Sequence, residues 1–180
     1  MTETTGFPPL TGPGARVLIL GTLPSRRSIA EGQYYGHPRN AFWPIMGKLL
    51  GAGRELSYAQ RTERLVEAGV AVWDVLAASI RPGSMDADID IATATANDFE
   101  SFFLPHPQIR LVCFNGRKAE ALFRRMVVPG LETRFNSLRY ETLPSTSPAY
   151  AAIGFEDKVK RWQAILRDTL VENSKRGEMK

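Results

Sequence analysis

The sequence predicts an α/β protein: a three-layer α/β/α sandwich with a central four-stranded, mostly parallel sheet. Three short apolar runs end in turn residues, as strands buried on both faces do, and a fourth strand follows a later loop. They cover residues 15–21, 70–76, 109–114 and 139–144. Segments with helical spacing lie between and after these runs, and such alternation indicates a parallel sheet covered by helices on both faces.

The chain of 180 residues is long enough for one domain with a sizeable core. We expect a single domain over residues 1–180, with a core over about residues 15–170 and flexible ends at 1–13 and about 172–180. No apolar run approaches the roughly 18 residues that cross a bilayer. The start, MTETTGFPPLTGPG, lacks the basic and apolar segments of a signal peptide. We therefore expect a cytoplasmic protein without a membrane segment.

Two helices are expected between the first and second strands. Asn40 is a good cap for a helix that continues through FWPIMGKLL, and Gly51 can end it. Ser57 and Gln60 form a capping-box pair at the start of the next helix, which Gly69 ends.

The second half contains one long loop and three further helices. Residues 77–94 are so rich in Gly, Pro, Asp and Ser that we expect a long loop, and such loops are often functional. Asn97 is expected to cap a short helix that ends before Pro105, and residues 115–127 form the next helix. In the last helix, apolar residues recur at steps of four, three, four and four. They are Phe155, Val159, Trp162, Leu166 and Leu170.

The net charge of +4 and the pI of about 9.4 permit a nucleic-acid partner without establishing one. Cys113 is the single cysteine and lies in an apolar run, so we expect a buried strand residue and exclude disulfides and cysteine metal sites.

A metal site is not expected. The two histidines, His37 and His106, lie far apart in the sequence. Asp86, Asp88 and Asp90 lack the spacing and terminal Glu of an EF-hand, which favours a solvated or loop-fixing role, although one of them could touch the site.

The segments that are rich in polar, Gly, Pro and aromatic residues directly follow the four predicted strands. Open parallel sheets bind ligands beyond the carboxyl ends of their strands. The loops at these four ends carry GTLPSRRS with QYYGHPRN, then SIRPGSMDAD, NGRK and STSPAYA. We therefore predict that polar, Gly/Pro-shaped and aromatic loops form a functional rim there.

Common enzyme motifs of α/β proteins are missing. The chain has no G-x-x-x-x-G-K-[ST] loop, no G-x-G-x-x-G after the first strand and no G-x-S-x-G elbow. A Ser-His-Asp triad could in principle be assembled from Ser145 or Ser147, His37 and an Asp of the second loop.

The strings LILGTLPS…YYGHPRNAFWPIMGKLLG, FNGRKA and LPSTSPAYA resemble the uracil-DNA glycosylase superfamily. They look closest to its hypoxanthine-DNA and mismatch-specific glycosylase branches, over about residues 15–170. The resemblance implies a four-stranded parallel sheet flanked by helices. It also implies hydrolysis, without metal or cofactor, of the N-glycosidic bond of a deaminated base, hypoxanthine or uracil, flipped out of double-stranded DNA. A monofunctional, monomeric enzyme that leaves an abasic site, associated with the nucleoid, is then expected.

Two site roles follow from the resemblance. Tyr35 matches the aromatic residue that stacks on the flipped base, and residues 36–38 match the turn after it. Mismatch-specific relatives place a catalytic Asn where this chain has Leu23, which cannot orient water. The hypoxanthine branch is thought to use the Asn of HPRN, which points to Asn40 as the water-positioning residue. A simple helix cap is the alternative for Asn40.

The last motif, STSPAYA, lacks the His that usually begins it in relatives with strong uracil activity, which favours a slower or purine-directed enzyme. Its serines would contact phosphate, and Ala149 and Tyr150 would fill the gap in the base stack. A strand-to-helix turn is the alternative for this segment, and a helix cap is the alternative for Asn115.

The full set of predicted site residues has three parts. The catalytic residue is Asn40; the base-binding residues are Gly21, Leu23, Pro24, Tyr35 and Asn115. The DNA-binding residues are Ser25, Arg26, His37, Arg39, Arg117, Lys118, Ser145, Thr146, Ser147, Pro148, Ala149 and Tyr150.

Three other functions stay open at this point. One is a G:U or G:T mismatch-specific uracil or thymine glycosylase, and another is a nucleic-acid-binding module that stacks a base without cutting. The third is a small-molecule hydrolase that uses the same rim.

Overall fold

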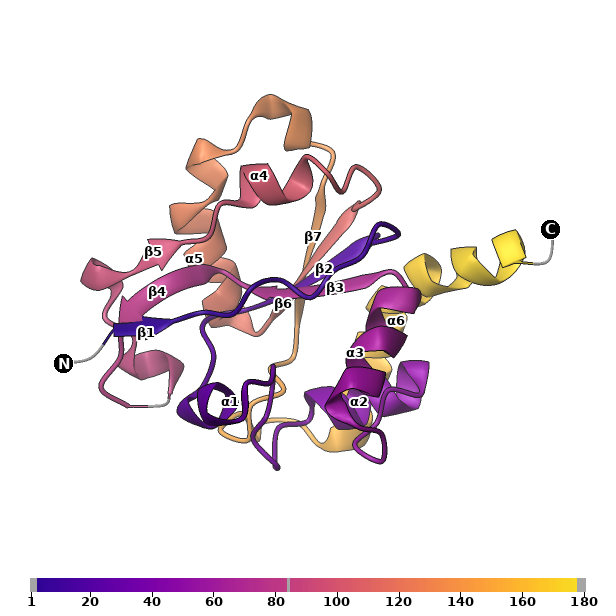
Figure 1. The fold of residues 1–180 in the computed structure, drawn as a ribbon, viewed down its shortest axis with the longest axis horizontal. Coiled ribbons are helices and arrows are strands. Elements are labelled where there is room, and N and C mark those ends of the chain that lie inside the picture. Colours follow the sequence, from indigo (N-terminus) through magenta and orange to yellow (C-terminus); the bar gives the residue numbers. More distant parts are fainter. Residues whose placement is uncertain (1–2, 84, 178–180) are drawn as a thin grey trace.

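The computed structural model describes residues 3–83 and 85–177 and confirms the three-layer α/β/α architecture (Figure 1). Its central sheet has the strand order β3-β2-β6-β7, and every neighbouring pair is parallel. The strands are β2 (Val17–Gly21), β3 (Val70–Asp74), β6 (Leu111–Asn115) and β7 (Arg139–Leu143).

Three strands of this sheet are wholly buried, which explains their apolar sequences. All residues of β2, β3 and β6 are buried, because helices cover both faces. The edge strand β7 is partly exposed and carries polar residues. The parallel registers align the carboxyl ends of all four strands at one edge of the sheet.

The helices divide between the two faces of the sheet. On one side lie α2 (Phe42–Leu50), α3 (Tyr58–Glu67) and α6 (Phe155–Gly177); on the other lie α4 (Phe99–Phe103) and α5 (Arg117–Met126) (Figure 1). The predicted capping box of Ser57 and Gln60 is present, and Gly51 ends α2 with a left-handed φ of 66°. No helix within the described ranges is long and apolar enough to cross a membrane.

The helix cap predicted at Asn97 was wrong, and so was the cap that was one alternative for Asn115. The cap of α4 is Asp98, whose carboxylate accepts from the Ser101 N–H, while the Asn97 amide donates to the Asp74 carbonyl. The cap position of α5 is Gly116, with a φ of 98°, and Asn115 ends β6 instead. In both cases the neighbouring Asn faces a tertiary partner that local sequence does not reveal.

A short helix that the sequence analysis treated as loop, α1 (Arg26–Glu31), follows β2. Ser25 is its N-cap and accepts a hydrogen bond from the Ser28 N–H at 3.1 Å. Gly32 ends the helix with a φ of 62°. The pattern was missed because the helix is only six residues long and has no amphipathic repeat.

A second, antiparallel sheet corrects two further expectations. It has the order β1-β4-β5, formed by β1 (Glu3–Thr5), β4 (Leu76–Ile80) and β5 (Thr95–Ala96). The predicted loop at 77–94 therefore begins as a strand and contains two short 3-10 turns. Residues 3–5 pair with β4, so the expectation of a flexible end at 1–13 is wrong for this part. Pairing across some 75 positions of sequence leaves no local signal.

The predicted apolar face of α6 packs onto the sheet. Val159, Trp162 and Leu166 are buried, whereas Phe155 at the start of the helix is 36% exposed. The side chain of Leu170 lies outside the described residues. The Trp162 ring packs edge-on against Phe42 at 6.0 Å, and its indole N–H donates to the Pro144 carbonyl at 3.0 Å.

Cys113 is fully buried in β6, as predicted. Burial raises the pKa of its thiol to about 12. The thiol is therefore protonated at neutral pH and does not act as a nucleophile.

We predict that Trp162→Ala lowers the free energy of unfolding by about 3–5 kcal/mol, because it leaves a cavity under α6 and removes the bond to Pro144. Urea unfolding measures this change. Gln163→Ala, at the exposed next position, is the control and should stay within about 0.5 kcal/mol of the wild type. Equal stability of the two variants would contradict this account of the core.

Candidate active site

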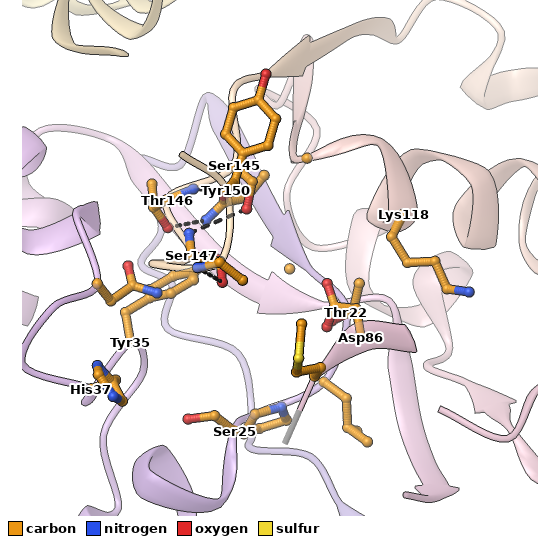
Figure 2. Close-up of a pocket in the computed structure, with 18 of the residues that line it drawn as sticks. Thr22, Ser25, Tyr35, His37, Asp86, Lys118, Ser145, Thr146, Ser147 and Tyr150 are labelled. Atoms are coloured by element: carbon orange, nitrogen blue, oxygen red, sulfur yellow. Dashed lines mark hydrogen bonds between the residues drawn. The ribbon is translucent and has the colours of Figure 1, made fainter. Parts of the chain in front are cut away.

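A cavity of about 460 Å³ lies where the four parallel strands end (Figure 2). Its volume falls in the range of roughly 300–1,000 Å³ that is typical of ligand pockets. Residues at or just after all four strand ends line it, including Gly21, Asp74, Asn115 and Ser145. The structure thus brings the predicted rim together.

Of the predicted site residues, only Arg26 and Arg39 fall outside the cavity lining, and both are exposed. The lining also contains residues outside that predicted set. These are Thr22, Ser28, Tyr34, Asp74, Met85, Asp86, Ala87 and Gly116. Asp74 had a usable signal, because it is a charged residue that ends an otherwise apolar strand at the binding edge.

The Tyr35 ring is fixed in position from behind. It stacks on the buried Phe42 ring, with centroids 4.0 Å apart and planes 24° from parallel. Its φ of 53° is uncommon for a residue other than glycine. Within the described chain the buried hydroxyl has no hydrogen-bond partner. Burial, together with the nearby Asp74, raises the pKa of the phenol, so it stays protonated and can donate.

The loop that carries Tyr35 is held by a residue that the sequence analysis missed. The Arg54 guanidinium donates to the His37 carbonyl at 2.8 Å and, more weakly, to the carbonyls of Tyr35 and Asn40 at 3.4 Å. The His37 ring accepts from the Arg39 N–H at 3.1 Å through Nδ1. His37 therefore fixes this turn and lines the cavity at the same time.

Asn40 lines the cavity and also supports the start of α2. The N-cap position is Ala41, so the cap predicted at Asn40 is displaced by one residue. The Asn40 side-chain oxygen still accepts from the Phe42 N–H, the first of the helix, at 2.9 Å. An amide oxygen has two lone pairs, so this oxygen can accept a second hydrogen bond from a molecule in the cavity. Support of the helix start and contact with a bound molecule are therefore compatible roles for Asn40.

Asn115 connects two sides of the cavity. Its amide accepts from the Thr146 N–H at 2.9 Å and donates to the Thr146 hydroxyl at 2.8 Å. The Thr146 carbonyl in turn accepts from the Ala41 N–H at 2.9 Å. Thr146 is only 1% exposed, so it joins β6 to the start of α2 rather than presenting its own groups at the surface.

The segment after β7 is folded on itself (Figure 2). The hydroxyl of Ser145 accepts from the Ser147 N–H at 3.2 Å, and that of Ser147 accepts from the Ala149 N–H at 3.3 Å. Tyr150 is 37% exposed, and its ring points away from the serines. The buried Lys158 donates to the Tyr150 carbonyl at 2.8 Å, and its ammonium lies 5.2 Å from the centre of the Tyr150 ring.

The end of β3 places a carboxyl group in the cavity. Asp74 is 4% exposed, and its Oδ2 has no hydrogen-bond partner within the described residues. A Cβ at Gly21 would lie 2.6 Å from Asp74 Oδ1 and 3.2 Å from the Tyr35 hydroxyl oxygen, so only glycine fits beside them. Burial raises the pKa of Asp74 to about 7; the Asp86 carboxylate adds to this rise and Arg81 opposes it.

The loop after β4 holds the GTLPS segment. The buried Arg81 guanidinium donates to the carbonyls of Leu23 and Pro24. The Thr22 hydroxyl donates to the Asp86 carboxylate at 2.5 Å. Asp86 therefore touches the site, as the sequence analysis allowed for one of the three aspartates of this loop.

Cationic residues stand at the side of the cavity formed by α5. Arg117 and Lys118 line it there. Figure 2 shows Lys118 across the cavity from Tyr35, with its ammonium directed away. Among the described residues, no three His, Cys, Asp or Glu side chains gather as a metal site would require.

Known proteins resemble this chain in sequence and in fold. A sequence model of the Uracil DNA glycosylase superfamily matches residues 8–168. A curated Methanosarcina acetivorans protein named Hypoxanthine DNA glycosylase is 37% identical over 166 residues, which cover 90% of this chain and 97% of that protein. A Methanosarcina barkeri protein of the same name is 38% identical over 133 residues, which cover 72% and 81%.

A solution NMR structure of an M. acetivorans protein, described as a candidate uracil DNA glycosylase, matches this fold with a TM-score of 0.74. It is 33% identical, and the match covers 93% of this chain and 99% of that one. The family match spans most of the chain and includes every segment that lines the cavity. The chain therefore belongs to the uracil DNA glycosylase superfamily.

Proposed function

We propose that the protein is a monofunctional DNA glycosylase that hydrolyses the N-glycosidic bond of hypoxanthine in double-stranded DNA and leaves an abasic site. The observation that carries this proposal is the meeting of Tyr35, Asn40 and the 145–150 segment around one cavity. The two relatives at 37% and 38% identity, both named hypoxanthine DNA glycosylases, support a deaminated purine as the substrate.

Base release requires the target nucleotide to leave the duplex. The phosphates beside it would contact the hydroxyls and N–H groups of the 145–150 segment and the cations Arg117 and Lys118. Tyr150 is exposed and directed outward, so its ring is suited to fill the gap left in the base stack.

The flipped base would stack on Tyr35. The Phe42 ring packs against one face of the Tyr35 ring and fixes its orientation before binding. A base that stacks on the other face therefore costs little additional conformational entropy of the Tyr35 side chain. Stacking of a base on such a ring contributes roughly 1–3 kcal/mol.

In the chemical step, the bond between the sugar C1′ and the base nitrogen breaks, and the sugar gains oxocarbenium character. Asn40 would aim a water at C1′ through the free lone pair of its side-chain oxygen. Lys118, the lysine of the lining, points away from Tyr35, which supports direct attack by water rather than a covalent lysine intermediate.

We also propose that the enzyme acts as a monomer, because the segments of a single chain complete the cavity, and that it works on the nucleoid in the cytoplasm. Uracil is the second candidate base, because the similar NMR structure is described as a candidate uracil DNA glycosylase.

Duplexes that contain deoxyinosine, uracil opposite G, or thymine opposite G test the function directly. Alkali should reveal strand breaks at deoxyinosine after incubation with the protein, with slower or no cleavage at uracil and thymine. Borohydride should trap no covalent adduct. Cleavage at uracil alone would overturn the preference for hypoxanthine, and DNA binding without any break would indicate a binding module.

We predict that Asn40→Ala lowers the single-turnover rate on deoxyinosine by about 100-fold or more, the usual scale for a group that assists proton transfer. Affinity for the duplex should change little, because the base still stacks on Tyr35. Asn136→Ala, the same substitution at an exposed site away from the cavity, is the control. Full activity of the Asn40 variant would remove it from the water-positioning role.

We predict that Lys118→Ala weakens binding to all duplexes alike and reduces the salt dependence, the slope of log K against log salt, by about 0.9. The physical reason is the loss of one phosphate contact with its released counterion. Fluorescence anisotropy at several salt concentrations measures this slope. Lys48→Ala, in the last turn of α2, should leave the slope at the wild-type value.

A further inference from the structure

We propose that Asp74 is a catalytic general acid, whose protonated carboxyl group donates a hydrogen bond and then a proton to the departing base. This inference rests on the proposed glycosylase function and extends it to the activation of the leaving group. The residue was not among the sequence-predicted site residues, and its place in the cavity lining is a finding of the structure.

The surroundings of Asp74 favour the neutral carboxyl. The side chain is 4% exposed, Oδ2 has no partner within the described chain, and none of the ion pairs between described residues includes it. The terminal nitrogens of Arg81 donate to the carbonyls of Leu23 and Pro24, so this nearby cation forms no hydrogen bond with Asp74. A buried carboxylate without a hydrogen-bond donor is costly, and burial outweighs the effect of Arg81, so the group takes up a proton.

A neutral carboxyl has an O–H that needs an acceptor. The Tyr35 hydroxyl near Asp74 is also protonated, and although the Asn115 amide acts on its pKa, it makes no hydrogen bond of standard geometry within the described chain. Two buried polar groups beside Gly21 therefore both lack partners within the described chain. Hypoxanthine offers two acceptors on one edge, O6 and N7, the same pair that guanine presents in the major groove. A base stacked on Tyr35 with this edge turned toward Asp74 would offer an acceptor to the carboxyl O–H.

The charged and titratable groups that face Asp74 come from two other segments. From the loop after β4, Asp86 raises the pKa of Asp74 and Arg81 lowers it, and burial brings the value to about 7. From the loop before α2, the phenols of Tyr34 and Tyr35 have raised pKa values and stay protonated. Asp74 thus changes charge near neutral pH, where general acids are most effective.

In the proposed step, Asp74 supplies the proton that neutralises the departing base. The bond between C1′ and N9 breaks, and its electron pair moves onto the base. The Asp74 proton moves to O6 or N7, so hypoxanthine departs as a neutral molecule. Water adds to C1′ and releases a proton to solvent, and the Asp74 carboxylate then recovers a proton from solvent.

The test is the pH profile of single-turnover cleavage of a deoxyinosine duplex at saturating enzyme. For the wild type we expect a constant rate below about pH 7 and a tenfold fall for each pH unit above it. Asp74→Asn keeps the shape but has no acidic proton, so it should be about 10²–10⁴-fold slower and lack this fall. Titration of the base itself would also appear in the pH profile of Asp74→Asn, so this profile is the control for that effect.

Asp86→Asn separates an acid role from a structural one. Because Asp86 raises the pKa of Asp74, the Asp86→Asn substitution should move the alkaline fall in rate to lower pH without abolishing it.

Binding of an uncleaved substrate gives a readout besides the rate, and a duplex with 2′-fluoro-deoxyinosine, which resists cleavage, serves for this. Its affinity for the wild type should weaken as the pH rises through 7, whereas its affinity for Asp74→Asn should not.

The fold of Asp74→Asn is checked by thermal unfolding. The folded-state pKa of Asp74 lies above its ordinary value near 4, so wild-type stability falls as pH rises from about 4 to about 7. The variant lacks this loss and should unfold at a temperature at least as high as the wild type at pH 8.

The outcomes distinguish the two proposals. One result is that the wild type cleaves deoxyinosine while Asp74→Asn is equally fast and shows the same alkaline fall in rate. That result would overturn the acid role of Asp74 and leave the proposed function standing. No cleavage of any duplex by the wild type would overturn the proposed function, and the acid role with it.

Discussion

The hydrogen bonds that join Asn115 to Thr146 hold the site together. One amide side chain at the end of β6 meets both the N–H and the hydroxyl of a residue 31 positions later, and the Thr146 carbonyl then receives the Ala41 N–H. A sheet end, the start of α2 and the segment after β7 are thereby fixed to one another. Loss of a buried partner leaves the other group unsatisfied at a cost of about 1–3 kcal/mol, so these three walls form a cooperative unit.

The same cavity keeps polar groups that a stable fold alone would not select. Buried donors and acceptors are nearly always paired, yet the Asp74 carboxyl and the Tyr35 hydroxyl lack partners within the described chain. The buried strand β3 and the stacked Phe42 ring hold these groups in place. Stability given up at a site in this way is the usual sign of a surface prepared for a ligand.

The parallel sheet, the helix pattern and the rim were predictable because each leaves a local trace in the sequence. Apolar runs mark the buried strands, the pair of Ser57 and Gln60 marks a helix start, and the strand ends carry the unusual loops. The parallel registers then bring those ends together. For this reason nearly all the proposed site residues line one cavity.

What escaped prediction depends on partners distant in sequence. Arg54 and Arg81 read as ordinary charged residues, and only the fold reveals that their guanidinium groups hold loop carbonyls. Asn115 looked like a helix cap because its partner, Thr146, belongs to another motif. Asp74 is the exception, because a charged residue at the end of an otherwise apolar strand is a local signal, although the burial that the other elements impose on it is not.

Strand β1 has a consequence beyond its three residues. It lies along β4, and β4 leads directly to Arg81 and the loop with Asp86 (Figure 1). Without β1, that edge of β4 would expose a row of unpaired N–H and C=O groups, which invites pairing with other chains. The three residues of β1 thus protect the strand that leads to the Asp86 loop of the cavity. Truncations or fusions before Gly6 would disturb β1 and, through β4, the residues that line the cavity.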